Sequence, residues 1–244
     1  MIKNNFCATI WKVWKYSLGS FQDETTKKYD DIVCIVRSFI FLQLVITNCF
    51  IVAGNIRHWN DHYTPPHYEQ FVTDPDPNVS AQVLPDKHVV KMPLETCQML
   101  AVVFSKWYYN WGDDLLPKKD GTPYNTEKGA FRGHPCTIWA AESVANTAWL
   151  IQHGFALLNE YETRYGKIHS CQTAMNAAEE VFEKHTGKTL DCHKEATPFA
   201  FAGPDEFKHD SSIDILTKYK RYIASKPWVC DNYLRKPDRK PDWV

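Results

Sequence analysis

The stretch HPCTIWAAESVANTAWLIQHGFALLNEYETRYGKIH, residues 134–169, indicates the fold class of the chain. Pro135 suits the first position of a helix, where its missing N–H costs nothing, and Gly166 suits the residue after the end of one. Apolar residues recur between them at helical intervals, with one break expected near 143–146. We therefore predict a mainly α fold in which this long helical region belongs to a single helical domain.

One face of this helical region mixes aromatic and polar side chains at steps of three or four residues, with one gap at 156–157. Its members are Trp139, Ser143, Asn146, Trp149, His153, Glu160, Arg164 and Lys167. Most other positions hold Ala, Leu or Ile, so the mixed face is expected to line an interior pocket or groove. Buried polar groups need partners, which indicates either a ligand or a satisfied network. The second interpretation, a structural Glu160–Arg164 pair among core tryptophans, stays open.

A second polar cluster lies upstream, in DKHVVKMPLE, residues 86–95. On a helix Lys87, Lys91 and Glu95 share one face at i, i+4 and i+8, and His88 lies beside them. A lysine, a histidine and a carboxylate held together suit proton transfer, or a lysine nucleophile. The alternative is a solvated, salt-bridged helix face.

The rest of the chain from residue 67 to 244 also favours helices. We expect a short strand near Glu69–Thr73, a helix from Asp86 to Asn110 with a kink at Pro93, and a long loop to residue 135. Further helices are expected over 170–184, ending before Gly187, and over 211–225, where Ser211 or Ser212 is the expected N-cap.

Residues 1–66 form a different kind of sequence, which we predict to be an N-terminal extension. Its apolar segment 32–54, IVCIVRSFIFLQLVITNCFIVAG, is long enough to span a membrane. Five lysines precede this segment, and a positive-inside orientation would keep the N-terminus in the cytoplasm. Arg37 and the polar residues within the segment favour instead a buried segment or a non-native extension. Both interpretations stay open.

The C-terminal segment interleaves cations with aromatic side chains. Among its cations we predict four to bind nucleic acid: Lys220, Arg221, Lys226 and Arg235. A basic, aromatic surface suits a phosphate backbone with stacked bases. A tail draped over the domain would show the same pattern.

Charge and cysteine usage exclude several classes of protein. A net charge of −1 leaves no global field to attract nucleic acid or an anionic membrane. The eight cysteines are irregularly spaced without a CxxC pair, which favours free thiols in a reducing compartment. His169, Cys171, Cys192 and His193 have poor chelate spacing, so we predict no metal and no cofactor.

Six blocks in order resemble a known family. They are FVTDPDPNVSAQVLPDKHVVKMPLETCQML, GAFRGHPCTIWAAES, NTAWLIQHGFALLNEYETRYGKIH, PDEFKHD, YKRYIASKPW and RKPDRKPDW. Together they look like a family of uncharacterised proteins encoded by T4-like, notably marine, tailed bacteriophages, and the resemblance covers 69–244. No activity can be transferred from it. Phage genomes of this type are rich in nucleotide metabolism, base modification and DNA repair, so the resemblance favours that area by association.

We therefore predict a phage protein that binds a nucleotide or nucleic acid and modifies or excises a base. The predicted catalytic residues, which would move protons, are His88, Glu95, His134 and Glu160. The predicted substrate-binding residues are Asp86, Lys87, Lys91, Trp139, Asn146, Trp149, Arg164, Lys167 and His169. The alternative is a non-enzymatic module that binds a host protein or nucleic acid. The expected location is the cytoplasm of the infected host, with an inner-membrane tether through 32–54 as the other option; the oligomeric state is left open.

Overall fold

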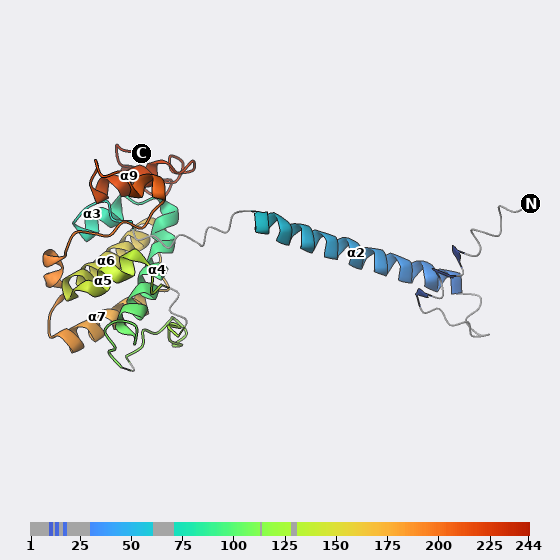
Figure 1. Ribbon diagram of the computed structural model, residues 1–244, viewed down its shortest axis with the longest axis horizontal. Coiled ribbons are helices and arrows are strands. Elements are labelled where there is room, and N and C mark those ends of the chain that lie inside the picture. Colours follow the sequence, from blue (N-terminus) through green and yellow to red (C-terminus); the bar gives the residue numbers. More distant parts are fainter. Residues whose placement is uncertain are drawn as a thin grey trace, which may run out of the picture. The chain divides into compact units, whose positions relative to one another are not determined.

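The chain divides into two compact units, Met1–Pro66 and His67–Val244, each described here by itself. The computed structural model is drawn in Figure 1. The residues that it describes are 10, 11, 13, 14, 17, 18, 30–60, 71–112, 114–127 and 131–244.

The first unit contains one long helix, α2 (Asp30–Asn60). The window Asp31–Cys49 is long and apolar enough to cross a membrane by length and composition, and most of its side chains are exposed. This agrees with the expected apolar helix, whereas membrane insertion stays a prediction.

The second unit is mainly helical, as predicted, with an isolated β-bridge between Pro117 and Pro123 in the part that is described. The expected break in the long helical region is real, because α5 (Pro135–Glu142) ends at Ser143 and α6 (Val144–Tyr165) begins after it. Ser143 caps α6, since its hydroxyl accepts a hydrogen bond from the Asn146 N–H at 3.1 Å. Gly166 ends α6 in the left-handed region, at φ 63°.

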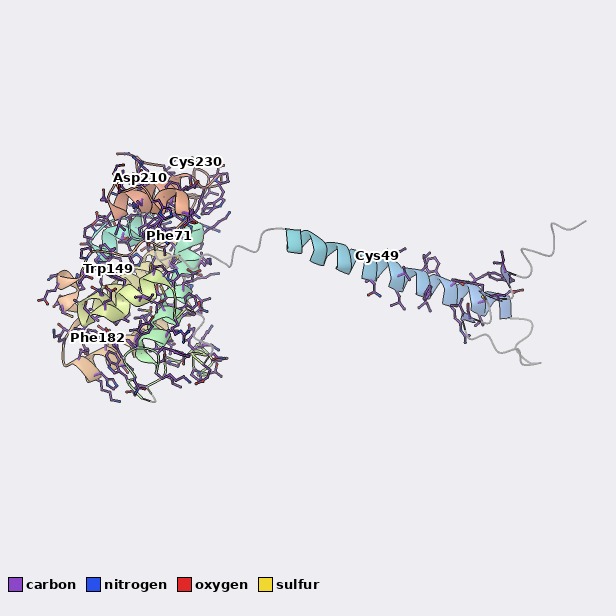
Figure 2. The ribbon with its side chains drawn as sticks, in the orientation of Figure 1. Cys49, Phe71, Trp149, Phe182, Asp210 and Cys230 are labelled. Carbon is purple, nitrogen blue, oxygen red and sulfur yellow. The ribbon has the colours of Figure 1, made fainter. Side chains whose placement is uncertain are left out.

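Helix α6 lies at the centre of this domain (Figure 1). It packs against five other elements: α3 (Pro77–Gln82), α4 (Asp86–Phe104), α5, α7 (Gln172–Thr186) and the 3-10 helix η1 (Leu190–Glu195). Both faces of α6 are consequently covered, which explains why a helix with few charged residues is stable here. Trp149 of α6 lies among the packed side chains of the domain, as does Phe71 (Figure 2).

The remaining elements are α8 (Asp205–Lys208), α9 (Ile215–Ala224) and the 3-10 helix η2 (Pro237–Arg239). The predicted N-cap of the last long helix was wrong. Asp214 caps α9, because its carboxylate accepts a hydrogen bond from the Thr217 N–H at 3.0 Å. A carboxylate at that position also interacts favourably with the helix dipole, so the helix starts later than predicted.

Two other boundaries differ from the prediction. Residues 71–73 form no strand, and 69 and 70 lie outside the described residues. The strand was wrong because Phe71, Val72 and Thr73 are buried against helices, with no neighbouring strand in the described chain to pair with. Helix α4 ends at Phe104 rather than at residue 110, and Pro93 lies inside it.

Candidate functional site

Helix α4 supplies four of the predicted site residues to one cavity. The cavity has a volume of about 310 Å³ and is called the α4 cavity below. It is lined by Phe71, Lys87, His88, Lys91, Met92, Glu95, Tyr222, Lys226 and Trp228. The structure therefore brings together Lys87, His88, Lys91 and Glu95, with the Lys226 predicted to bind nucleic acid.

Glu95 is the buried acid of this cavity. The residue is only 2% exposed, and its Oε1 lies 2.8 Å from the Lys91 Nζ, one helical turn earlier. Lys91 itself is half exposed, so it connects a buried carboxylate to the cavity mouth. Burial of a carboxylate costs desolvation free energy, so a carboxylate kept in such a place is a candidate catalytic group.

His88 forms one wall of the cavity as a neutral imidazole. Burial lowers its pKa to about 3, with further contributions from Lys226, Lys91 and Lys87. Its ring stacks on Phe71 at a centroid distance of 4.2 Å and meets Trp228 edge-on at 5.4 Å. Its Nδ1 is buried without a hydrogen-bond partner in the described structure. Such an atom is costly unless a ligand satisfies it.

Three lysines surround this wall. Lys87 Nζ lies 4.6 Å from the ring centroid of Trp228, and Lys226 Nζ lies 4.0 Å from that of Tyr222. These are cation–π contacts, which hold the ammonium groups beside the cavity. With Lys91 they form a positively charged rim that suits the phosphates of a polynucleotide.

Sequence reasoning missed the apolar and aromatic members of the site. Phe71 was assigned to a strand and Met92 was given no role, whereas Tyr222 and Trp228 were placed on the basic, aromatic C-terminal surface and not at this cavity. Phe71 and Trp228 are 157 positions apart in the sequence, so no periodic pattern links them. The local signal was Lys226 two positions before Trp228, and Phe71 has no lysine close to it in the sequence.

Asp86, Glu160 and Arg164 form a buried ion network instead of an open site. Arg164 Nη1 lies 3.0 Å from Asp86 Oδ1, and its Nε lies 2.8 Å from Glu160 Oε1. The same guanidinium donates hydrogen bonds to the carbonyls of Leu84 and Gln82, both at 2.8 Å. Because these groups satisfy one another, we assign them a structural role and give them no part in the function proposed below.

The predicted base-binding residues are also occupied. Trp139, Asn146 and Trp149 are at most 4% exposed. The Asn146 amide donates hydrogen bonds to the Trp139 carbonyl at 2.7 Å and the Thr197 hydroxyl at 2.8 Å, and the Trp149 indole donates one to the Pro75 carbonyl at 2.7 Å. Asn146, Trp149, Glu160 and Arg164 of the buried stripe thus have partners within the protein, as the second of the two interpretations of the sequence expected.

The other predicted residues lie apart from the α4 cavity lining. His134 caps α5, where its Nδ1 accepts a hydrogen bond from the Cys136 N–H at 3.2 Å. The others are Lys167, His169, Lys220, Arg221 and Arg235. Within the described residues, no three His, Cys, Asp or Glu side chains are grouped as metal ligands.

Comparison with known proteins gives one match. Residues 70–173 match the model of a phage-associated family described as pyrimidine dimer DNA glycosylase. The matched segment contains His88, Lys91 and Glu95, whereas Lys226 and Trp228 lie beyond it. No curated protein and no solved structure matches the chain. The match supports a DNA-binding function of the base-excision type, which is the class of function predicted from the sequence.

Proposed function

We propose that the domain 67–244 is a DNA glycosylase that excises a damaged pyrimidine, with Glu95 as its catalytic carboxylate. The observation that carries the proposal is the buried Glu95 in a cavity whose rim is cationic and whose wall holds an unsatisfied imidazole nitrogen. The family match over 70–173 names the same class of reaction for related sequences.

The chemistry of base excision fits a carboxylate in this position. When the bond between C1′ and the base breaks, its electron pair leaves with the base, which takes up a proton, and positive charge develops on the sugar. A water molecule then adds its oxygen to C1′ and loses a proton, so the reaction is a hydrolysis. A fixed carboxylate stabilises that charge more than it stabilises the neutral ground state. Glu95 would take this role, and Lys91 at 2.8 Å would hold it in place.

The other cavity residues would bind the DNA. Lys87 and Lys226 would contact phosphates on either side of the target nucleotide, since they are held at the rim by Trp228 and Tyr222. His88 would form a hydrogen bond with the sugar or the base through its Nδ1. Because enzymes acting on a base must take it out of the stack, aromatic rings such as Trp228 would support the displaced nucleotide.

The setting that we propose is the cytoplasm of a host infected by a T4-like phage. This rests on the resemblance of six sequence blocks to proteins of such phages. Free thiols in the domain are consistent with a reducing compartment.

The test uses a duplex oligonucleotide that carries one pyrimidine dimer, with an undamaged duplex as the substrate control. We expect the full chain to excise the base, and Glu95→Gln to slow the reaction at least about 100-fold while leaving duplex binding within a few-fold. Glu162→Gln, an exposed carboxylate on α6, is the matched control and should behave as wild type. Excision at the wild-type rate by Glu95→Gln would refute the assignment, as would no excision by the wild-type chain.

A further inference from the structure

A second cavity lies on another face of α4 and has no part in the proposed function. Its volume is about 700 Å³, and it is called the thiol cavity below. It is lined by Leu94, Gln98, Val102, Lys118, Lys119, Asp120, Tyr124, Asn125, Phe131, Ser170 and Cys171. Among the described residues that line it, Cys171 is the cysteine.

Cys171 has a second thiol as its neighbour. Cys97 of α4 is fully buried and donates a hydrogen bond to Cys171, which is 3% exposed. The two residues are 74 positions apart, and tertiary packing alone brings them together. Adjacent thiols, one of which faces a cavity, have the arrangement of a reactive cysteine and a resolving cysteine.

The surroundings of Cys171 favour its thiolate. The residue precedes α7, so its sulfur lies at the positive end of a 15-residue helix. The Tyr124 hydroxyl lies 4.0 Å from the Cys171 sulfur, and His169 Nδ1 accepts a hydrogen bond from the Cys171 N–H at 3.1 Å. The hydrogen bond from Cys97, with smaller contributions from His169 and Tyr124, lowers the pKa of Cys171 to about 5 against the opposing effect of burial.

The cavity gives a small oxidant access to this sulfur. Three of the lining residues, Lys118, Lys119 and Asp120, are exposed and connect the cavity to solvent. A molecule of hydrogen peroxide is little larger than water, and the cavity is more than ten times the volume that a water occupies in the liquid.

We propose that Cys171 is a peroxide-reactive thiol and that Cys97 resolves its oxidised form into an intramolecular disulfide. In the first step the Cys171 thiolate attacks a peroxide oxygen, the O–O bond breaks, and hydroxide or alkoxide leaves. The sulfur is thereby oxidised to a sulfenic acid and the peroxide is reduced. In the second step the Cys97 sulfur displaces the hydroxyl group, its proton leaves with that group as water, and an S–S bond forms. The bond would join α4, two residues from Glu95, to the start of α7.

The first experiment measures the oxidation of the full chain by hydrogen peroxide with peptide mass spectrometry. We expect the Cys97 and Cys171 peptides to lose two hydrogen atoms and become linked. In Cys97→Ser, dimedone should trap a sulfenic acid at Cys171, and in Cys171→Ser neither product should form. Cys136 is the matched control: it is 3% exposed and near the start of α5, with a tyrosine hydroxyl 3.5 Å away, yet it does not line the thiol cavity. It should stay reduced.

A second experiment needs no variant and so does not depend on how a variant folds. Alkylation of Cys171 by iodoacetamide should change less than about twofold between pH 6 and 8, whereas an ordinary free thiol of pKa about 8.5 reacts roughly 70-fold faster at pH 8. At pH 6 Cys171 should react about tenfold faster than such a thiol, after its lower intrinsic nucleophilicity is allowed for. The exposed Cys230 is the internal reference. The proposal would be overturned if the alkylation rate of Cys171 followed the same pH profile as that of Cys230. It would also be overturned if the Cys97 and Cys171 peptides stayed reduced after Cys230 had been oxidised. So would the absence of sulfenic acid in Cys97→Ser.

Discussion

At the scale of the residue, burial determines the protonation state of two histidines of this domain. His88 in the α4 cavity and His153 on α6 are both buried, and burial lowers the pKa of each to about 3. His88 is further influenced by three nearby lysines, whereas for His153 burial alone acts. Both rings are therefore neutral at physiological pH, and proton donation by an imidazolium at position 88 plays no part in the proposed reaction.

This neutrality predicts a loss of stability in mild acid. In the unfolded chain both histidines take up a proton as the pH falls below about 6.5, but in the folded chain they do not until about pH 3. The unfolded state therefore binds more protons in this window, and the free energy of unfolding decreases as the pH is lowered. Together the two side chains should contribute a loss of about 3 kcal/mol between pH 7.5 and 5.5. Urea unfolding at several pH values measures this.

Substitution separates the two contributions. His88→Asn or His153→Asn should each reduce the pH dependence by about one proton, and the exposed His209→Asn should leave it as in wild type. If the free energy of unfolding of both variants, His88→Asn and His153→Asn, depended on pH as in wild type, the rings would already be charged in the folded protein.

At the scale of the element, α6 is held close to its neighbours by the absence of a side chain at one position. A Cβ built on Gly154 would lie 2.5 Å from Met175 Cε of α7 and 3.0 Å from Thr96 Cγ2 of α4. These distances are shorter than van der Waals contact, and the glycine lies inside a helix where alanine would otherwise be favoured. Close packing of three helices therefore outweighs helix propensity at this position.

Gly154→Ala should destabilise the domain by about 1–3 kcal/mol, because Met175 must leave its position in a closely packed core. Gly133→Ala is the control, since a Cβ there would meet nothing within 4 Å. Thermal and urea unfolding of the two variants measure the difference. A Gly154→Ala variant more stable than wild type would mean that the Met175 side chain moves at little cost.

The ion network at the end of α6 links distant elements. Arg164 contacts Asp86, the first residue of α4, and the carbonyl of Leu84 in the loop before it. Glu160 is also contacted by Arg239 of η2 at 3.2 Å. Removal of the arginine would leave two buried carboxylates without their main partner. We expect Arg164→Met to cost about 3–5 kcal/mol of stability.

The same substitution distinguishes the structural role from phosphate binding. If Arg164 is structural, Arg164→Met lowers the melting temperature but leaves the affinity of the folded protein for duplex DNA within a few-fold of wild type. Lys226→Met, by contrast, weakens DNA binding. A stable Arg164→Met variant with weak DNA binding would restore the role that the sequence suggested. Measuring affinity well below the melting temperature keeps the two effects apart.

At the scale of the whole molecule, the chain combines a helical domain with an apolar helix in a separate unit. Side chains of α2 between 31 and 49 are largely exposed, among them Phe39 at 72% and Leu44 at 57%. Such an apolar surface is unfavourable in water and is expected to be buried against another apolar surface. The length and composition of the helix suit burial in a bilayer.

We expect the full chain, expressed in bacteria, to sediment with membranes and to resist extraction with high salt or alkaline carbonate. The fragment 67–244 should remain in the supernatant, since that unit has its own core. Replacing Phe39 and Leu44 by Asp should release the full chain, because charges are costly in the centre of a bilayer. A full chain that stays in the supernatant would instead favour a protein partner for α2.

Local pattern was enough to predict the helical class, the break at Ser143, the caps at Gly166 and Gly187 and the shared face of Lys87, Lys91 and Glu95. Each of these depends on residues within two or three turns, and helix periodicity and capping act over that distance. The strand at 69–73 and the N-cap at Ser211 or Ser212 were wrong, because pairing partners and competing caps decided those boundaries.

Only the tertiary structure distinguished the two polar clusters. Both looked alike as patterns of charged and aromatic residues along a helix. Asn146, Glu160 and Arg164 found partners from distant segments, whereas His88, Lys91 and Glu95 line a cavity. Phe71 and Trp228 joined that cavity, and Cys97 met Cys171, only through folding. The physical reason is that periodicity is a property of neighbouring residues, whereas the satisfaction of a buried polar group depends on whatever the fold brings against it.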